Sequence, residues 1–117
     1  MDGNGRWAKQ RNHPRFYGHI RGAGIVSSVV ERASDLGLES LTLYAFSTEN
    51  IFRPEQEKDV LFKLLQKFLL KECKRILANN IQFQVIGKTT FLPQATQDLI
   101  KNLEAISRHN TGLKLIF

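Results

Sequence analysis

Hydrophobic residues along this chain follow two spacings, one typical of helices and the other typical of strands. Apolar residues recur at helical spacing in three segments, which are Gly18–Leu36, Pro54 to Asn79–Asn80, and Pro93 to about His109. Short β-rich runs separate and follow these segments, at Leu41–Phe46, Ile81–Ile86 and Leu113–Phe117. The pattern therefore predicts helix, strand, helix, strand, helix and strand in that order.

The predicted order is typical of an α/β protein with a mostly parallel sheet and flanking helices. Because crossovers between parallel strands are right-handed, the three strands are expected to lie parallel in one sheet. The run Leu41–Phe46 is apolar on nearly every residue, and this favours a strand that is covered on both faces. We expect one domain over residues 1–117.

The composition of the chain shows an excess of positively charged residues. The chain has 117 residues with a formal net charge of +6, which predicts attraction to anions. Phosphate esters, nucleic acid and acidic lipid are all anions that a positively charged protein could bind. The single cysteine, Cys73, excludes a disulfide framework and any multi-cysteine metal site, and it favours a reducing cytosol. Without an apolar run long enough to span a bilayer, the chain is expected to be cytoplasmic, with membrane association left open.

The opening segment Met1–Trp7 is the first candidate for chemistry. Gly3, Asn4 and Gly5 tolerate left-handed backbone, so they can direct several amides toward one anion at the start of a helix. Arg6 can add a bidentate contact to a phosphate, and Asp2 beside a diphosphate offers a carboxylate to Mg²⁺. A simple turn at the start of a helix explains the same residues equally well.

Two further groups of polar residues could reach the same anion. Arg15 and His19 lie near the start of the next predicted helix, although a lone histidine there is usually a cap or a surface residue. The segment Ser47–Asn50 follows the first predicted strand, and open α/β sheets bind ligands beyond the carboxyl ends of their strands. For Ser47 alone, capping of the following turn is the better interpretation.

Three separated blocks of residues together resemble the cis-prenyltransferases, the family of the undecaprenyl diphosphate synthases. The blocks are Met-Asp-Gly-Asn-Gly-Arg-Trp-Ala at 1–8, Gly-His at 18–19, and Tyr-Ala-Phe-Ser-Thr-Glu-Asn at 44–50. They agree with the family in order and spacing, which a lone glycine loop does not. The resemblance continues through Arg53-Pro54 and Glu57 to Thr111-Gly112-Leu113.

The resemblance implies a transferase that condenses isopentenyl diphosphate with an allylic diphosphate such as farnesyl diphosphate. Mg²⁺ would be the cofactor, the product a cis-polyprenyl diphosphate for the lipid carrier of cell-wall glycans, and the full-length parent a homodimer. It implies catalytic roles for Asp2, which would also hold the metal, and for Asn50. The implied substrate-binding residues are Gly3, Asn4, Gly5, Arg6, Trp7, Arg15, His19, Ser47, Thr48, Glu49 and Arg53, with Glu57 supporting the loop.

A growing polyprenyl chain would need an apolar tunnel beside the sheet. Its candidate wall residues are Ala45, Leu61, Leu64, Leu65 and Phe68. Plain core packing is the better interpretation for most of them taken singly. The positive charge would attract diphosphates, and it is also compatible with peripheral contact with an anionic membrane.

The chain departs from the family pattern at both ends and at two internal positions. The family's first strand precedes the opening block, and its segment that binds isopentenyl diphosphate follows the position of Phe117. Ile51 and Ile116 replace a usual tryptophan and a usual asparagine. We therefore expect an incomplete domain that is inactive alone, with uncovered sheet edges and marginal stability.

Two other classes of function compete with a truncated transferase. A non-catalytic partner subunit could bind allylic diphosphate within a prenyltransferase complex. Such subunits tend to lose the Asp-Gly-Asn-Gly-Arg signature that this chain keeps. A nucleic-acid module would interleave basic and aromatic residues on one exposed face, whereas Phe46, Phe62, Phe68 and Phe83 fall on apolar stripes. The sequence therefore predicts no nucleic-acid partner.

Overall fold

A computed structural model describes residues 3–45 and 55–117, apart from the side chains of residues 56 and 57. The elements within these ranges are α1 (Asn4–Lys9), α2 (Arg15–Asp35), β1 (Ser40–Thr42), α3 (Glu55–Ala78), β2 (Gln82–Gln84), α4 (Gln94–Ser107) and β3 (Lys114–Ile116). The predicted alternation of helices and strands is confirmed. Each strand is shorter than its apolar run, and α2 begins three residues before the predicted start.

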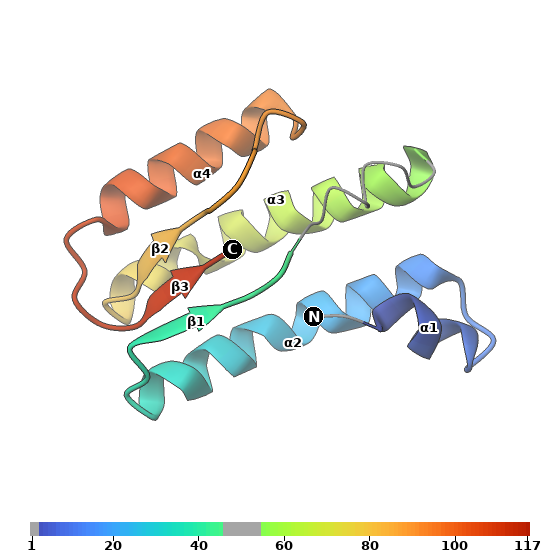
Figure 1. The fold of residues 1–117 in the computed structure, drawn as a ribbon, viewed down its shortest axis with the longest axis horizontal. Helices are drawn as coiled ribbons and strands as arrows, with labels where there is room; N and C mark the ends of the chain where they lie inside the picture. Colours follow the sequence, from blue (N-terminus) through green and yellow to red (C-terminus); the bar gives the residue numbers. More distant parts are fainter. Residues whose placement is uncertain (1–2, 46–54) are drawn as a thin grey trace.

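The three described strands form one parallel sheet in the order β1-β3-β2 (Figure 1). Leu115 of β3 pairs with Leu41 of β1 on one side and with Phe83 of β2 on the other. The predicted parallel α/β architecture is therefore confirmed. All three strands point toward the half of the molecule that contains α1 (Figure 1).

The core lies between one face of this sheet and the helices. Phe83 and Leu115 are almost completely buried there, against residues that come from three helices. These helical core residues are Val30 and Ala33 of α2, Leu69 and Ile76 of α3, and Ile100 and Leu103 of α4. Burying each large side chain contributes roughly 1.5–3 kcal/mol, so the helical apolar stripes and the strands stabilise one another.

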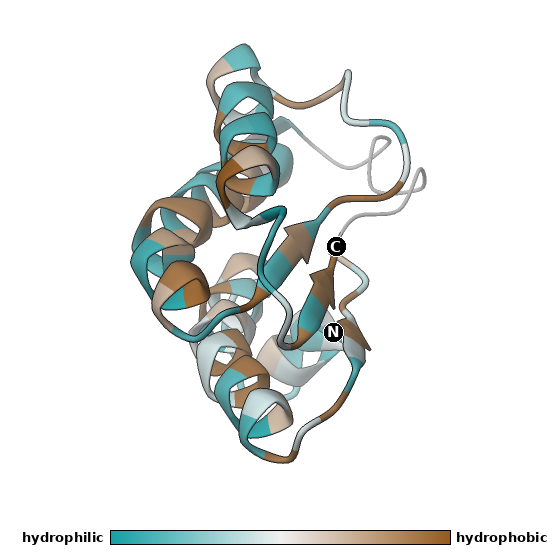
Figure 2. Ribbon diagram, turned by 90° about the vertical axis from the view of Figure 1, so that its left-hand side faces the viewer, coloured by the Kyte–Doolittle hydropathy of each residue, from teal (hydrophilic) through white to brown (hydrophobic). Residues whose placement is uncertain are grey.

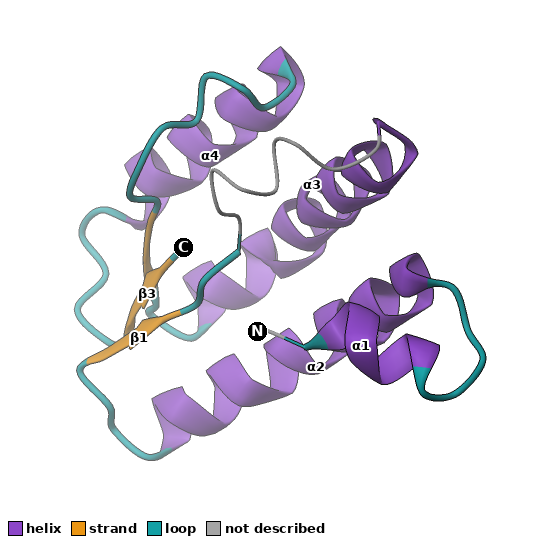
Figure 3. Cartoon of the chain, turned by 45° about the vertical axis from the view of Figure 1, so that its right-hand side comes forward, coloured by secondary structure: helices purple, strands orange, loops and turns teal. Residues whose placement is uncertain are grey.

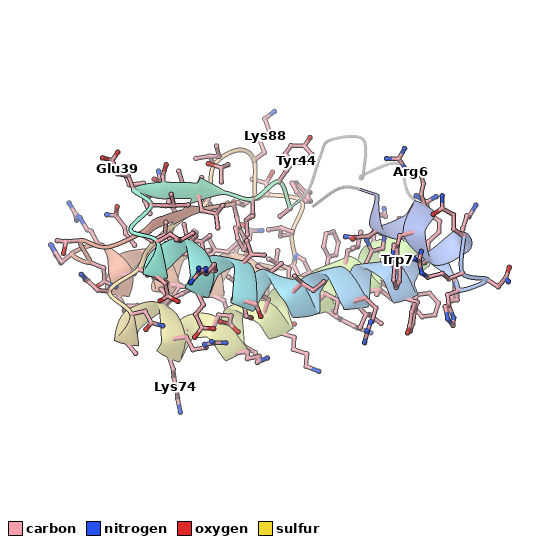
Figure 4. The ribbon with its side chains drawn as sticks, turned by 90° about the horizontal axis from the view of Figure 1, so that it is seen from below. Arg6, Trp7, Glu39, Tyr44, Lys74 and Lys88 are labelled. Atoms are coloured by element: carbon pink, nitrogen blue, oxygen red, sulfur yellow. The ribbon has the colours of Figure 1, made fainter. Side chains whose placement is uncertain are left out.

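The other face of the sheet is open within the described residues. Thr42, Gln84 and Lys114 are exposed there, and the Tyr44 side chain just beyond β1 is 71% exposed. Figure 2 shows apolar and polar residues alternating along the strands, and Figure 4 shows Tyr44 on the side away from α2 and α3. The prediction that Leu41–Phe46 is covered on both faces was wrong for its described part, because helices pack on one face of β1.

The outer edge of β2 is protected by side chains of α4. The amide of Phe83 donates a hydrogen bond to Ser107 Oγ at 3.0 Å, and the amide of Val85 donates to Glu104 Oε1 at 2.8 Å. An unpaired strand edge invites association with other chains, and these bonds occupy the amides that would pair. The edge at β2 is therefore covered, and the expectation that a missing first strand leaves other edge amides uncovered stays a prediction.

None of the helices within the described residues is long and apolar enough to cross a bilayer.

Candidate functional site

The opening segment forms a left-handed turn followed directly by α1. Gly3 has φ = +83°, a conformation that costs glycine little, and its carbonyl accepts a hydrogen bond from the Trp7 amide at 2.9 Å. This confirms the predicted turn at the start of a helix. Because α1 has only six residues, its dipole is small, and side chains and loop amides would have to supply most of any attraction for an anion.

One face of α2 receives this segment. Arg15, Gly18, His19 and Gly22 recur at spacings of three and four residues, so they share one side of the helix. A methyl group placed on Gly18 would lie 1.9 Å from the Asn4 carbonyl oxygen. One placed on Gly22 would lie 2.6 Å from Asn4 Nδ2. The two glycines therefore let the Asn4 backbone and carboxamide sit directly against α2.

Arg15 reaches from α2 to the opening segment. A methyl group placed on Gly5 would lie 3.1 Å from atoms of the Arg15 guanidinium, so this side chain lies over the Gly5 backbone. Gly5 is buried beneath it. His19 follows Arg15 by one helical turn and is half-buried. The structure thus brings Gly3, Asn4, Gly5, Arg15 and His19 into one region.

The charged side chains of the opening segment from residue 3 onward and of the first half of α2 are all basic. Residues 3–30 include Arg6, Lys9, Arg11, Arg15 and Arg21 but no aspartate or glutamate. Arginine side chains offer paired donors that match the geometry of phosphate oxygens. The arrangement can therefore hold an anion of the phosphate type.

Arg6 and Trp7 point to opposite sides of α1. Figure 4 shows Arg6 on the side of Tyr44 and Lys88, and Trp7 on the side of the helical layer. The Trp7 ring stacks on Tyr17 with a centroid distance of 6.3 Å, and the Arg11 guanidinium lies 4.5 Å from its centroid. In this structure Trp7 packs α1 against α2, and its predicted contact with substrate stays a prediction.

Sequence reasoning missed the role of Tyr17 in this aromatic cluster. The His13 ring stacks on Tyr17 from the turn between the helices, with the centroids 4.3 Å apart. The contact between Trp7 and Arg11 could have been predicted, because side chains four residues apart lie on the same side of a helix. No comparable local signal pairs Trp7 with Tyr17, because the turn at 10–14 decides where the two helices meet.

Several predicted site residues lie outside the described part of the chain. These are Asp2, Ser47, Thr48, Glu49, Asn50 and Arg53, together with the side chain of Glu57. The strand β1 runs toward α1, and the described residues 43–45 follow it at the carboxyl edge of the sheet (Figure 3). Convergence of these residues on the opening segment stays a prediction.

The described residues contain no group of three or more His, Cys, Asp or Glu side chains able to hold a metal ion. The predicted metal ligand, Asp2, falls outside this range.

The residues predicted to line a tunnel divide into two groups. Leu65 and Phe68 pack against the core, and Phe68 contacts Phe117 with ring centroids 5.4 Å apart. Leu61 and Leu64 are half-buried, and Ala45 is exposed. Core packing is thus the observed role of Leu65 and Phe68.

A small pocket is lined mainly by residues of α2 and α3, and its lining includes the polar residues Ser27, Glu31, Glu72 and Arg75. Ser27 Oγ donates a hydrogen bond of 2.7 Å to Glu72 Oε1, and the Glu72 residue is only 5% exposed. Arg75 lies 3.7 Å from the other Glu72 oxygen and donates to Glu31 at 3.0 Å. This network links the two helices, and its pattern of charge offers no additional anion site.

Comparison with known proteins gives a consistent result over the whole chain. The family description "Putative undecaprenyl diphosphate synthase" matches residues 1–117. An isoprenyl transferase of Staphylococcus saprophyticus is 46% identical over all 117 residues, which correspond to 46% of that protein. A ditrans,polycis-undecaprenyl-diphosphate synthase of Aliivibrio fischeri, specific for (2E,6E)-farnesyl diphosphate, is 45% identical over 98% of this chain and 45% of its own length.

Solved structures agree with this result. Lavandulyl diphosphate synthase from Lavandula x intermedia, in complex with dimethylallyl diphosphate, superposes with a TM-score of 0.92 at 35% identity, over 99% of this chain and 50% of that one. A probable undecaprenyl diphosphate synthase of Campylobacter jejuni has a TM-score of 0.75 at 29% identity, over 82% of this chain and 47% of that one. The chain spans about half the length of the relatives it matches.

Proposed function

Because this chain belongs to the cis-prenyltransferase family of undecaprenyl diphosphate synthases, we propose that it supplies the allylic-diphosphate half of an isoprenyl transferase active site. The reaction would join isopentenyl diphosphate to farnesyl diphosphate and release diphosphate. The product would be a cis-polyprenyl diphosphate for the lipid carrier of cell-wall glycans. The printed specificity of the Aliivibrio fischeri relative supports farnesyl diphosphate as the allylic substrate.

The observation that carries the proposal is the position of Arg15 over the Gly5 backbone. It gives the opening segment a guanidinium group next to a glycine-rich turn, in a stretch without carboxylates at residues 3–30. Backbone amides at residues 3–5, the guanidinium groups of Arg6 and Arg15, and His19 would together hold the diphosphate.

The chemistry of this set suits the departure of an allylic diphosphate. When the bond to carbon breaks, negative charge grows on the leaving oxygen, and Arg6 and Arg15 would stabilise that charge as it develops. Asp2 is the only carboxylate in the first 30 residues. Magnesium in enzymes is often held by one or two carboxylates plus substrate phosphates, so this donor set fits Mg²⁺. Bound Mg²⁺ would supply further charge neutralisation to the diphosphate.

The remaining predicted residues complete the proposed site from the segment that follows β1. Asn50 would lie by the reacting carbon, Ser47, Thr48 and Glu49 beside it, and Arg53 at its border. The 117-residue chain by itself would bind allylic diphosphate without sustained synthesis of polyprenyl product. The full-length parent would work as a homodimer in the cytoplasm, with peripheral contact with the membrane that receives its product.

A titration of farnesyl diphosphate in the presence of Mg²⁺ tests the proposed site. Trp7 is the only tryptophan of the chain and lies on α1, so its fluorescence reports on ligands at the opening segment. We expect Arg15→Ala to weaken binding by about 10- to 100-fold, since a hydrogen bond to a charged group contributes roughly 1.5–3 kcal/mol.

Arg32→Ala is the matched control, because Arg32 lies in the last turn of the same helix. It should leave the affinity unchanged. Equal affinities of the wild-type chain and the Arg15→Ala variant would overturn the assignment of Arg15 to this site.

A further inference from the structure

The outer face of α3 carries a regular stripe of lysines. The lysine stripe consists of Lys63, Lys67, Lys71 and Lys74 together with Leu70 and Leu77, and every one of these residues is exposed. Their spacing of three and four places them on one side of the helix. Leu70 is 59% exposed and Leu77 is 39% exposed. Leu69, Glu72 and Ile76 occupy the opposite side and are buried.

Few acidic residues of α3 lie close enough to the lysine stripe to neutralise its positive charge. Asp59 lies one turn before Lys63, and the only acidic residue of α3 after it is Glu72. The Glu72 carboxylate faces inward, where it bonds to Ser27 and lies near Arg75. Like charges four residues apart destabilise a helix slightly, so folding gains nothing from this pattern.

The lysine stripe is separate from the candidate site. Figure 4 shows Lys74 projecting from the helical side of the molecule, whereas Arg6, Tyr44 and Lys88 project from the opposite side. A diphosphate held by Arg6 and Arg15 would therefore not engage these lysines.

We propose that the lysine stripe docks the protein on an anionic lipid bilayer. Each lysine near such a surface contributes attraction to acidic head groups, and its apolar stem can lie along the interface while the ammonium stays in water. Leu70 lies between Lys67 and Lys71, and Leu77 follows Lys74 on the same side of the helix, so both would enter the apolar boundary of the bilayer. The proposal names the surface for the membrane contact expected above, and it requires no catalytic activity.

Nucleic acid fits the lysine stripe less well than a bilayer does. Non-specific binding of single strands uses exposed aromatic rings for base stacking, and the stripe has none. The neighbouring rings of Phe62 and Phe68 are half-buried and contact Phe91 and Phe117. A phosphate backbone also offers no apolar counterpart to Leu70 and Leu77.

Co-sedimentation of the 117-residue chain with vesicles tests this proposal. Vesicles of phosphatidylcholine alone are compared with vesicles that also contain phosphatidylglycerol. The variant K67E/K71E/K74E reverses three charges of the stripe. The control K88E/K101E/K114E reverses three exposed lysines elsewhere, so both variants lower the net charge of +6 equally.

We expect binding of the wild-type chain to the phosphatidylglycerol vesicles only, with a partition coefficient on the order of 100-fold lower for the stripe variant. The control should bind much more tightly than the stripe variant. A second variant, Leu70→Ser, changes no charge and removes no core contact, and it should weaken binding several-fold.

Equal losses in the two triple variants would overturn the proposal, because net charge would then explain the binding. Absence of vesicle binding by the wild-type chain would overturn the proposal too. So would the finding that single-stranded RNA binds the same lysines and displaces the protein from the vesicles. The titration with farnesyl diphosphate measures binding at a different surface, the opening segment. A failure of the proposed diphosphate site can therefore be distinguished from a failure of the proposed membrane contact.

Discussion

Helix α2 meets its two helical neighbours in physically different ways. Against α1 the contact is made by Gly18 and Gly22, and the Asn4 backbone lies where a side chain would otherwise be. Against α3 the contact includes the polar network of Ser27, Glu72, Arg75 and Glu31. The first contact is short and opposes backbone atoms, whereas the second is made by side chains that can rotate.

This difference suits the two regions to different demands. If the opening segment presents amides and arginines to a diphosphate, as we propose, it needs a fixed position, because catalytic groups lose efficiency with small displacements. A contact made through long side chains tolerates adjustment between the helices. The predictions below test this contrast, beginning with the largest expected effect.

Gly18→Ala should have the largest effect on stability. Its methyl group would lie 1.9 Å from the Asn4 carbonyl oxygen, and a backbone atom cannot rotate away. We expect a loss of about 3 kcal/mol in the free energy of unfolding, measured by chemical denaturation, because α1 must shift off α2.

Gly24→Ala is the matched control on the same helix, since nothing lies within 4 Å of its added methyl group. It should stabilise the chain by roughly 0.5–1 kcal/mol through helix propensity. Similar effects of the two substitutions would show that α1 is not held by close approach at Gly18.

Glu72→Ala should have the next largest effect. The substitution removes a buried carboxylate and leaves the Ser27 hydroxyl without its acceptor, at a cost of about 2 kcal/mol. Thermal denaturation measures the change, and Glu39→Ala, at an exposed glutamate, should change stability little. A loss as small as that of the control would mean that the polar network contributes no stability to the contact between α2 and α3.

Gly22→Ala tests the positioning of the opening segment separately from the stability of the fold. Its methyl group would meet the Asn4 carboxamide at 2.6–2.8 Å, and this side chain can rotate, so we expect a stability change of about 1 kcal/mol or less. Rotation of Asn4 would nevertheless disturb the opening segment and weaken the affinity for farnesyl diphosphate in the fluorescence titration. Unchanged affinity, again with Gly24→Ala as the reference, would argue against a positioning role for the contact.

Glu31→Gln should have the smallest effect. Arg75 and Glu31 form an ion pair whose side chains are 41% and 57% exposed, and water screens such pairs. We expect a loss of about 0.5 kcal/mol that disappears at high salt. Denaturation at low and at high salt measures both quantities. A larger effect that persists in salt would mean that this pair, and not Glu72 alone, holds α2 to α3.

Much of the fold could be predicted from local patterns of residues. The apolar spacing predicted the helices α2 and α3, because helical periodicity is a local property. Val30, Ala33, Leu69 and Ile76 of the predicted stripes are buried, whereas Leu36 and Leu77 are exposed. The order of helices and strands then predicted the parallel sheet. The three separated blocks at 1–8, 18–19 and 44–50 together predicted the family, which the comparison over residues 1–117 confirms.

Other features depended on contacts between distant segments, and local patterns carry little information about these. The sequence of α4 gave no sign that Ser107 and Glu104 would occupy the edge amides of β2. Nor did the motif show that Trp7 would turn away from Arg6 to stack on Tyr17. Both outcomes depend on where whole elements pack.

The sequence by itself determined the order of helices and strands and the family to which the chain belongs, because periodicity and motif spacing are properties of neighbouring residues. Only the tertiary structure decided that Gly18 and Gly22 seat Asn4, and that Arg15 lies over Gly5. The physical reason is steric. A glycine in a helix looks the same in sequence whether it faces solvent, as Gly24 does, or another backbone, and only the packing of α1 on α2 distinguishes the two.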